Sequence, residues 1–263
     1  MTPSIGTRAL SDQISWSDVN RPALLGSCRG LPFWLKKFVW KSPHHGLGII
    51  QLVRQFASAL PPGSRVLDAG AGSTPYRELF DHCEYKTSDL TAHEGKIDYV
   101  CPITECPLPD QSFDAILFTE VLEHVQDPVL ALKELRRLLV PQGYLCLSVP
   151  FMLGVHAEHD YFRFSKVCLK EVFSRSGLEV LQITPRFGLP MTFWGLLWAL
   201  GIWLARADIF ASPVRRWIGR LIGFGVLGLA LASLLPFRLL DFCDKEQNFT
   251  VGYAVLARRP ATV

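Results

Sequence analysis

The feature that most restricts the fold is a regular alternation of short apolar runs with amphipathic segments. Short apolar runs bounded by turn residues indicate buried strands, whereas apolar residues at helical spacing indicate helices. Strands joined by helical crossovers run parallel in one sheet that is covered on both faces. We therefore predict an α/β fold with a mostly parallel, Rossmann-like sheet. The expected strands are Ser64–Gly70, Glu84–Asp89, Asp98–Cys101, Phe113–Thr119, Tyr144–Val149, Leu178–Thr184 and Phe249–Arg258, and the expected helices are Leu47–Leu60, Tyr76–His82 and Pro128–Leu139.

Two segments without any charged residue, Phe187–Ala205 and Leu221–Phe237, interrupt this pattern before the last strand. Each is close to the roughly 20 residues that span a bilayer core. A helix that is apolar on every face is buried in a large core or in a membrane. We predict a membrane-associated helical insertion between the last two strands, with a buried helical pair or a dimer interface as the alternative.

The charges around this insertion bear on its topology. Both of its ends join strands of one sheet, so a spanning hairpin would place the intervening Arg206–Arg220 segment, with four arginines, on the far side of the membrane. That arrangement opposes the positive-inside rule. We expect a monotopic or re-entrant insertion at the cytoplasmic face of a membrane, with two spanning helices as the alternative. The segment Gly30–Lys41 mixes aromatic residues with lysines, which suits a helix in the headgroup layer or a cap on the catalytic domain.

These segments give the expected domain organisation. Residues 1–45 form an N-terminal segment, residues 46–186 and 241–263 form the catalytic domain, and residues 187–240 form the apolar insertion. The N-terminus lacks a basic start followed by an apolar core, so we expect no secretory signal.

Composition limits the classes of partner. Charged residues make up 19% and hydrophobic residues 49% of the chain, with a net charge of +3. The mean hydropathy of +0.22 is high for a soluble enzyme and low for a protein with many membrane spans. No run of lysines and arginines could follow a nucleic-acid backbone, so we do not expect a nucleic-acid partner. Seven scattered cysteines without a C-x-x-C pair indicate reduced thiols.

A glycine-containing turn follows the first expected strand. Gly70 and Gly72 allow a ligand to approach the backbone closely, and Pro75 suits the first turn of a helix. Asp89 ends the next strand, where a carboxylate can bind ribose hydroxyls. A nicotinamide-dependent oxidoreductase fits poorly, because its third glycine would fall at Pro75.

Several motifs in order resemble the class I S-adenosylmethionine-dependent methyltransferases, and among them the "type 11" group. The motifs are VLDAGAGSTPYRELF, SDL, the segment from LPDQSFDAILFTEVLEHVQDP to LCLSVPF, and the H-x-x-x-D-Y-x-R-F element His156–Phe164. The resemblance covers about Ser64–Leu181, and NFTVGYAVLARR is similar to the last strand of the family. It implies a seven-stranded sheet whose last strand is antiparallel, and S-adenosyl-L-methionine as the cofactor.

The resemblance also implies roles for individual residues. Asp68, Gly70 and Gly72 are expected around the methionine part of the cofactor, and Asp89 at its ribose. Further along, Ile103 is expected to pack on the adenine ring, while Thr119, Glu120 and Val121 flank the sulfonium. Pro102 departs from the family, which often has an acid there that accepts from the adenine amino group.

Methyl transfer from a sulfonium is an in-line displacement, so the protein mainly supplies alignment, a dry pocket and a base when the acceptor is a hydroxyl. The candidates for that catalytic role are His124, His156, His159 and Asp160. For His124 the alternative is a backbone contact at the start of a helix. For Asp160, with Tyr161 and Arg163, it is a structural brace. We expect no metal site, since two histidines and one aspartate lack further support from cysteine or histidine.

The function expected from the sequence is S-adenosylmethionine-dependent O-methylation of a hydrophobic acceptor at a membrane. Lipids, quinones, terpenoids and lipid-linked glycans all fit, because the insertion precedes the last strand on the acceptor side. The alternative is a catalytically silent, membrane-associated adaptor that has kept the fold. Homodimerisation stays open.

Overall fold

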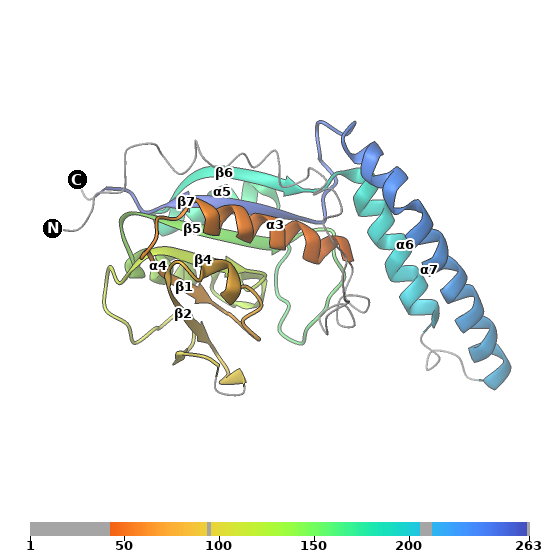
Figure 1. Ribbon diagram of the computed structural model, residues 1–263, viewed down its shortest axis with the longest axis horizontal. Helices are drawn as coiled ribbons and strands as arrows, with labels where there is room; N and C mark the ends of the chain where they lie inside the picture. The colour runs from red at the N-terminus through yellow and green to blue at the C-terminus, as the bar shows by residue number, and fades with distance from the viewer. Residues whose placement is uncertain (1–42, 94–95, 206–211, 262–263) are drawn as a thin grey trace. The chain divides into compact units, whose positions relative to one another are not determined.

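The computed structural model describes residues 43–93, 96–205 and 212–261, and it contains one seven-stranded sheet (Figure 1). The strand order is β3-β2-β1-β4-β5-β7-β6. Strand β1 pairs in parallel with β2 and β4, and β4 pairs in parallel with β5, whereas β7 runs antiparallel to β5. The predicted α/β, mostly parallel Rossmann-like sheet is thereby confirmed. The strands are β1 (Arg65–Ala69), β2 (Glu84–Asp89), β3 (Tyr99–Val100), β4 (Phe113–Thr119), β5 (Leu139–Pro150), β6 (Glu179–Arg186) and β7 (Gly252–Arg258).

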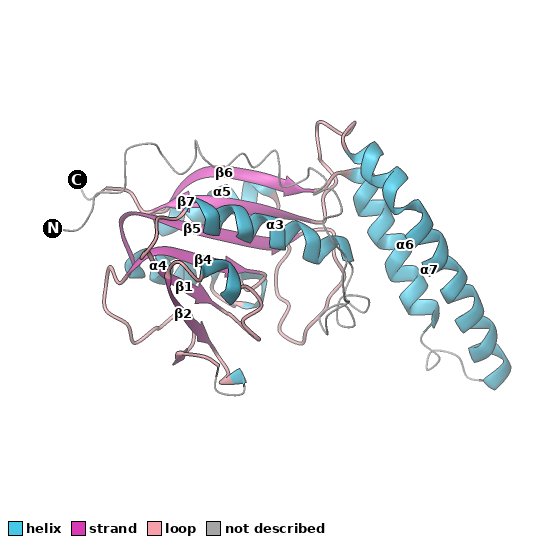
Figure 2. Ribbon diagram, viewed as in Figure 1, coloured by secondary structure: helices cyan, strands magenta, loops and turns pink. Residues whose placement is uncertain are grey.

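Helices cover both faces of the sheet, and alternate residues of each strand face opposite layers. In β4, Ala115 and Leu117 join the core packed under α3 (Pro43–Ala59), which lies on the near face of the sheet in Figure 2. Ile116 and Phe118 join the other core, with α4 (Pro128–Leu138) and α5 (Lys166–Ser176). Because both faces are buried, the strand is apolar at nearly every position, as expected for a parallel sheet.

The sheet order reverses between β1 and β4, which pair with each other although β2 and β3 intervene in the chain. The crossovers from these two strands lead away in opposite directions. Ligands of open α/β sheets bind at the carboxyl ends of the strands at such a point. This edge is therefore where the glycine turn after β1 and the segment after β4 come together.

By compactness the chain divides into two units, and the larger contains Ile49–Thr184 and Gly252–Val263. The smaller contains Pro185–Val251 and holds the helical hairpin of α6 (Leu189–Ala205) and α7 (Pro213–Asp241) (Figure 1). Both helices lie between β6 and β7 in the chain, as the sequence predicts. The two helices approach closely at Gly223, where a Cβ would collide with the backbone of Ala205.

Large apolar side chains are exposed along much of the hairpin. Among the described residues, α7 is the helix long and apolar enough to cross a membrane, with a mean hydropathy of 2.0 in its best window, of which 17% is buried. The apolar helix α6 is shorter. Exposed large side chains occur on both helices, including Phe193, Trp203, Trp217, Phe224 and Leu235.

Several local predictions differ from the structure. Helix α7 begins at Pro213, so Arg215, Arg216 and Arg220 are helical and do not lie in a loop; Ser212 caps the helix by accepting from the Arg215 N–H at 3.3 Å. The segment expected to form a helix over Tyr76–His82 contains only a 3₁₀ turn at Arg77–Phe80. Strand β5 begins at Leu139, before the expected start at Tyr144, and the expected helix correspondingly ends at Leu138.

Helix α5 was not predicted, although Ser165 caps its first turn by accepting from Cys168 N–H and Gly177 ends it with φ +75°. The aromatic and basic segment Gly30–Lys41 and residue Arg206 lie outside the described residues.

Candidate active site

The glycine turn after β1 has the backbone that the sequence predicts. Gly70 and Gly72 have φ values of +72° and +54°, in the left-handed region that favours glycine. A Cβ at Gly70 would collide with the side chain of Val121, whereas no heavy atom lies within 4 Å of the position that a Cβ at Gly72 would take. The turn therefore packs closely at its first glycine and leaves open space at its second.

Asp89, at the end of β2, holds this turn in place. Its Oδ2 atom accepts from the Gly72 N–H at 2.9 Å, and its Oδ1 atom accepts from the Thr91 N–H at 3.1 Å. The Nε2 atom of His93 lies 3.2 Å from the same Oδ1 atom. Asp89 thus fixes the glycine turn, and its partly exposed carboxylate stands beside the open space at Gly72.

Asp68 is the buried acid of this edge, with a relative exposure of 1%. The hydroxyl of Tyr85 donates to its Oδ2 atom. Burial raises the pKa of the Asp68 carboxyl to about 7, and the negative charge of Asp89 adds to the rise, while the Tyr85 hydrogen bond opposes it. A carboxyl poised near neutrality favours a cationic ligand, because a nearby positive charge stabilises its ionised form.

The segment after β4 continues the site. Thr119 ends the strand, and Glu120 follows with φ +54°, a conformation that is costly for a residue with a side chain. The backbone N–H of Glu120 donates to the Ser148 carbonyl at 2.9 Å, and its Oε1 atom accepts from the Ser148 hydroxyl at 2.7 Å. Contacts to β5 therefore hold the strained residue next to Val121, which packs over Gly70.

The opposite side of the edge is formed by the residues after β3. The Cys101 N–H donates to the Asp89 carbonyl at 2.9 Å, and Ile103 packs partly buried against the core. Pro102 between them is exposed and has no N–H to donate. The Sγ atoms of Cys101 and Cys106 lie 2.9 Å apart, and both residues are free cysteines.

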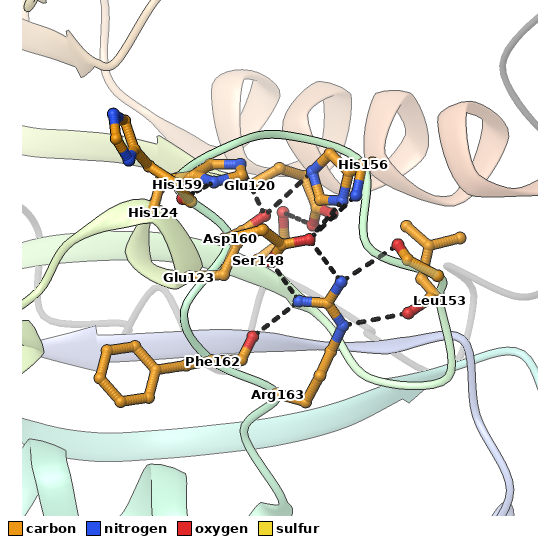
Figure 3. A network of polar contacts seen from close by, with 11 residues as sticks. Glu120, Glu123, His124, Ser148, Leu153, His156, His159, Asp160, Phe162 and Arg163 are labelled. Carbon is orange, nitrogen blue, oxygen red and sulfur yellow. Dashed lines mark hydrogen bonds and ion pairs between the residues drawn. The ribbon is translucent and has the colours of Figure 1, made fainter.

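Two histidines converge on a buried glutamate in the segment after β4 (Figure 3). Glu123, with no exposed side-chain surface, has its Oε1 atom 3.6 Å from Nε2 of His124 and 4.0 Å from Nε2 of His156. The rings of His124 and His156 meet edge to face with centroids 5.0 Å apart. Glu123 and His124 lie in a 3₁₀ turn, Leu122–His124, so β4 positions both directly.

Asp160 and Arg163 form a brace behind His156. The guanidinium of Arg163 contacts both carboxylate oxygens of Asp160 and also donates to the carbonyls of Leu153 and Gly154 (Figure 3). Oδ2 of Asp160 accepts from the His156 N–H at 3.1 Å and lies 3.1 Å from its Nδ1 atom. Because the Asp160 side chain is fully buried and bonded to Arg163, the geometry favours the brace over a role in proton transfer.

The charges of this brace shift the pKa values of its members. Hydrogen bonds from Arg163 hold the pKa of the Asp160 carboxyl well below its usual range. Burial lowers the pKa of the His156 imidazole, an effect that the Asp160 carboxylate opposes.

His159 takes a different place from His156. Its Nδ1 atom lies 3.2 Å from the Tyr161 hydroxyl, and its ring stacks on the Tyr161 ring with centroids 5.9 Å apart. Its backbone carbonyl lies 2.6 Å from Nδ1 of His124. The structure thus brings His124 and His156 together, while the exposed ring of His159 pairs with Tyr161.

Glu123 and Tyr85 are not among the site residues that the sequence predicts. Glu123 lies in a short turn after β4. Only the fold shows that His124 and His156 both lie near its carboxylate. Tyr85 lies in β2, where it pairs with Val66, and a tyrosine in a strand gives no sign that its hydroxyl meets an acid on β1.

Known proteins are similar to the part of this chain that forms this edge of the sheet. Residues 67–147 match the family model described as "Methyltransferase domain". The chain is 34% identical over 107 residues to the probable tRNA methyltransferase 9B of Bos taurus, covering 37% of this chain and 24% of that protein. It is 32% identical over 124 residues to a ubiquinone biosynthesis O-methyltransferase of Xanthomonas campestris, covering 41% of this chain and 52% of that one.

Among solved structures, a putative sarcosine dimethylglycine methyltransferase from Galdieria sulphuraria superposes with a TM-score of 0.52 at 15% identity. That match covers 85% of this chain and 91% of the other. At such low identity the likeness concerns the fold. The chain spans only 24% and 52% of the lengths of the two curated relatives above, so the match with them is one of domains.

The fold, the glycine turn and the family match together define a class I S-adenosylmethionine-dependent methyltransferase domain. The residues fit S-adenosylmethionine as its cofactor. The open space at Gly72 admits a ligand against the backbone, and the buried carboxyl of Asp68 suits a cationic group. Both stand at the carboxyl edge of the sheet next to Asp89.

Proposed function

We propose that this chain is an S-adenosylmethionine-dependent methyltransferase that methylates an oxygen atom of a hydrophobic or lipid-linked acceptor at a membrane. The observation that carries the choice of oxygen is the convergence of His124 and His156 on Glu123, next to the cofactor segment. A hydroxyl acceptor must lose its proton as it attacks, and this cluster can hold a hydroxyl and assist that loss.

The cluster is close to the proposed cofactor site, because its first two residues follow shortly after Val121, which packs on the glycine turn. Val121 packs over Gly70 in the cofactor turn. Glu123 and His124 follow Val121 by two and three residues, in the 3₁₀ turn after β4. A group bound by these residues would lie next to the glycine turn that we propose holds the cofactor. Alignment of this kind is the main contribution a protein makes to methyl transfer.

When bound, S-adenosylmethionine supplies an activated methyl group and its own leaving group. The chain supplies the rest. The glycine turn and Asp68 hold the donor, Glu120 is fixed by Ser148 beside it, and the Asp160–Arg163 brace orients His156 toward the acceptor. The buried surroundings of Glu123 keep water from competing for its contacts.

The proposal of a hydrophobic acceptor rests on the helical hairpin. Its exposed apolar side chains, among them Phe193, Trp217 and Phe224, would be covered by the acyl region of a membrane. A hairpin carried in the same chain would hold the catalytic unit at the surface where lipid, quinone or lipid-linked acceptors reside. We place the protein at the cytoplasmic face of a membrane, with the hairpin inserted from one side.

One relative is named a ubiquinone biosynthesis O-methyltransferase, which agrees with a hydrophobic hydroxyl acceptor. Another is named a probable tRNA methyltransferase, so the expectation that nucleic acid is not a substrate stays a prediction. The two classes of acceptor separate into different phases on extraction, which makes the choice between them direct to test.

The experiment incubates full-length protein with methyl-labelled S-adenosylmethionine and either membrane lipid extract or total tRNA. We expect label in an organic-phase product whose mass rises by one methyl group. His156→Ala should reduce this turnover by about 100-fold or more, the usual contribution of a group that assists proton transfer, and should leave cofactor affinity unchanged. Label in the tRNA, or undiminished turnover of the variant, would contradict the proposal. Cofactor binding without transfer to either acceptor would favour the silent adaptor.

A further inference from the structure

The sequence alone predicts no metal site, but from the fold we propose that Glu123, His124 and His156 form a binding site for a divalent transition-metal ion. The Oε1 atom of Glu123 and one ring nitrogen of each histidine all lie within 4.8 Å of one another. Two imidazoles and one carboxylate are a recurrent set of protein ligands for catalytic metal ions, and they leave further positions for water or substrate. The site deepens the proposed function, because it follows the segment that packs on the proposed cofactor turn.

The two imidazoles are oriented as metal ligands usually are. Nδ1 of His124 lies 2.6 Å from the His159 carbonyl oxygen, which can only accept, so this nitrogen carries the proton. Nδ1 of His156 lies 3.1 Å from Oδ2 of Asp160. In each ring Nδ1 thus lies near an oxygen, and Nε2 is the nitrogen that lies nearer to Glu123. Ligating histidines characteristically donate their second N–H to a carbonyl or a carboxylate in this way.

The scaffold behind the ligands is rigid. Asp160 is itself held by the two terminal nitrogens of the Arg163 guanidinium, which also donates to the Leu153 and Gly154 carbonyls (Figure 3). Glu123 is fully buried, and the Tyr161 N–H donates to its backbone carbonyl at 2.9 Å. The two histidines come from segments 32 residues apart in the sequence, so their common orientation is a product of the fold.

The three candidate ligand atoms lie within 4.8 Å of one another, so an ion would bind only after they move closer together. Bonds of about 2.0–2.1 Å in a tetrahedral site place neighbouring ligand atoms about 3.3 Å apart. The separations from Glu123 Oε1 are 3.6 Å to His124 and 4.0 Å to His156. Rotation of the partly exposed imidazoles, whose side chains are 26% and 38% exposed, can close this difference.

The donor set selects the class of ion. Imidazole nitrogen suits zinc, copper, nickel and iron, whereas magnesium, calcium and manganese prefer oxygen ligands. We therefore expect Zn²⁺ and Co²⁺ to bind more tightly than Mn²⁺, and Mg²⁺ to bind least tightly. At this site an ion would bind the acceptor hydroxyl through an open position and lower the pKa of that hydroxyl. The role rests on the proposed function, whereas the binding does not.

The test measures metal binding to full-length protein in detergent, stripped with chelator and free of cofactor and acceptor. Calorimetry should give one Co²⁺ or Zn²⁺ per chain, with Mg²⁺ at least about 10-fold weaker. His124→Gln and His156→Gln should each weaken Co²⁺ binding by about 100-fold or more, since loss even of an outer-sphere partner costs about 10–100-fold. Glu123→Gln should do the same, and the two histidine variants keep the test valid when that buried change prevents folding.

His159→Gln is the matched control, because it changes a histidine of the same loop whose ring lies against Tyr161 instead of Glu123. It should leave Co²⁺ affinity unchanged. The Co²⁺ spectrum separates this site from the Cys101–Cys106 pair, since thiolate ligands give an intense charge-transfer band that imidazole and carboxylate do not.

A thiolate band, equal affinity in all variants or no binding of Co²⁺ and Zn²⁺ would overturn the site. Binding at the site without methyl transfer would refute the proposed function alone, and full turnover by stripped protein would refute the role of the ion.

Discussion

The two compact units of this chain differ in how far their apolar side chains are buried. In the sheet unit, both faces of β4 are covered, and Ala115 to Phe118 have no exposed surface. In the hairpin, Phe193, Trp217 and Phe224 remain more than half exposed, although the hairpin is the more apolar unit. The sheet unit therefore buries its hydrophobic residues in its own core. The hairpin leaves many of them exposed, and burying them requires a surface outside the described residues.

The polar residues show the complementary difference. The sheet unit places buried acids at its carboxyl edge, where Asp68, Glu123 and Asp160 surround the candidate site. In the hairpin, Asp241 at the end of α7 accepts from the Gly188 and Met191 N–H groups and thereby caps the start of α6. The buried charges of one unit are thus suited to chemistry, and that of the other to fastening two helices at one end.

The largest effect should follow from filling the space at Gly70. Gly70→Val places a side chain against Val121 and forces a β-branched residue into a left-handed backbone with φ +72°. We expect S-adenosylmethionine affinity to fall by about 100-fold or more, because the turn must move away from the donor position. Calorimetry measures the affinity, and flotation with lipid vesicles measures attachment of the hairpin, which should be unchanged.

Gly63→Ala is the matched control for backbone strain. Gly63 has φ +78°, and no heavy atom lies within 4 Å of the position its Cβ would take. The substitution should cost about 1 kcal/mol of stability, with cofactor affinity retained. Equal loss of affinity in both variants would show that general destabilisation, rather than the contact with Val121, lowers the affinity.

The contrast between the units also explains what the sequence could predict. The parallel sheet follows from apolar runs such as that of β4, and the cofactor turn follows from Gly70, Gly72 and Asp89, because both depend on local sequence. The convergence of His124 and His156 on Glu123 depends on the loop that carries His156 folding back over β4. No spacing in the sequence encodes that distance.

The predicted helix boundaries differ from those in the structure for a related reason. Arg215, Arg216 and Arg220 are polar and were assigned to a loop, but Pro213 and the Ser212 cap start the helix before them. Charged residues on the exposed face of a helix do not end it, and capping residues mark its start more reliably than hydropathy does. Helix α5 was missed although it has the same kind of signals, Ser165 at its start and Gly177 at its end.

A second variant should break the membrane attachment of the hairpin alone. Phe224 is 64% exposed in the middle of α7. Phe224→Glu removes an apolar side chain worth about 1.5–3 kcal/mol on burial and introduces a charge. We therefore expect partition into vesicles to fall by at least about 10-fold, which flotation measures. Cofactor affinity should be unchanged, since the cofactor site lies in the sheet unit.

Val167→Glu is the control for this change, because Val167 is 77% exposed on α5 in the sheet unit. It introduces the same charge at an apolar residue that is even more exposed than Phe224. Vesicle partition should be retained. Equal losses in the two variants would mean that net charge governs partition, and no loss in either would remove the hairpin from membrane attachment.

The smallest effect should be a pH dependence confined to the sheet unit. Burial raises the pKa of Asp68 in the free protein to about 7, so below that pH the carboxyl holds a proton. A cationic ligand stabilises the ionised form, and binding below pH 7 must release that proton. Affinity for S-adenosylmethionine should therefore rise by about tenfold from pH 6 to pH 8 and become level above the pKa.

Calorimetry in buffers of different ionisation enthalpy checks this sign directly, because the released proton is taken up by the buffer. Release should approach one proton at pH 6 and nearly vanish at pH 8. Asp68→Asn should bind more weakly but with no change over this range. Vesicle partition should be level as well, since the arginines of α7 keep their charge throughout. Affinity that falls as the pH rises would mean that the Asp68 carboxyl binds the donor as a neutral acid, and the sheet unit would then recognise the cofactor through hydrogen bonding instead of charge.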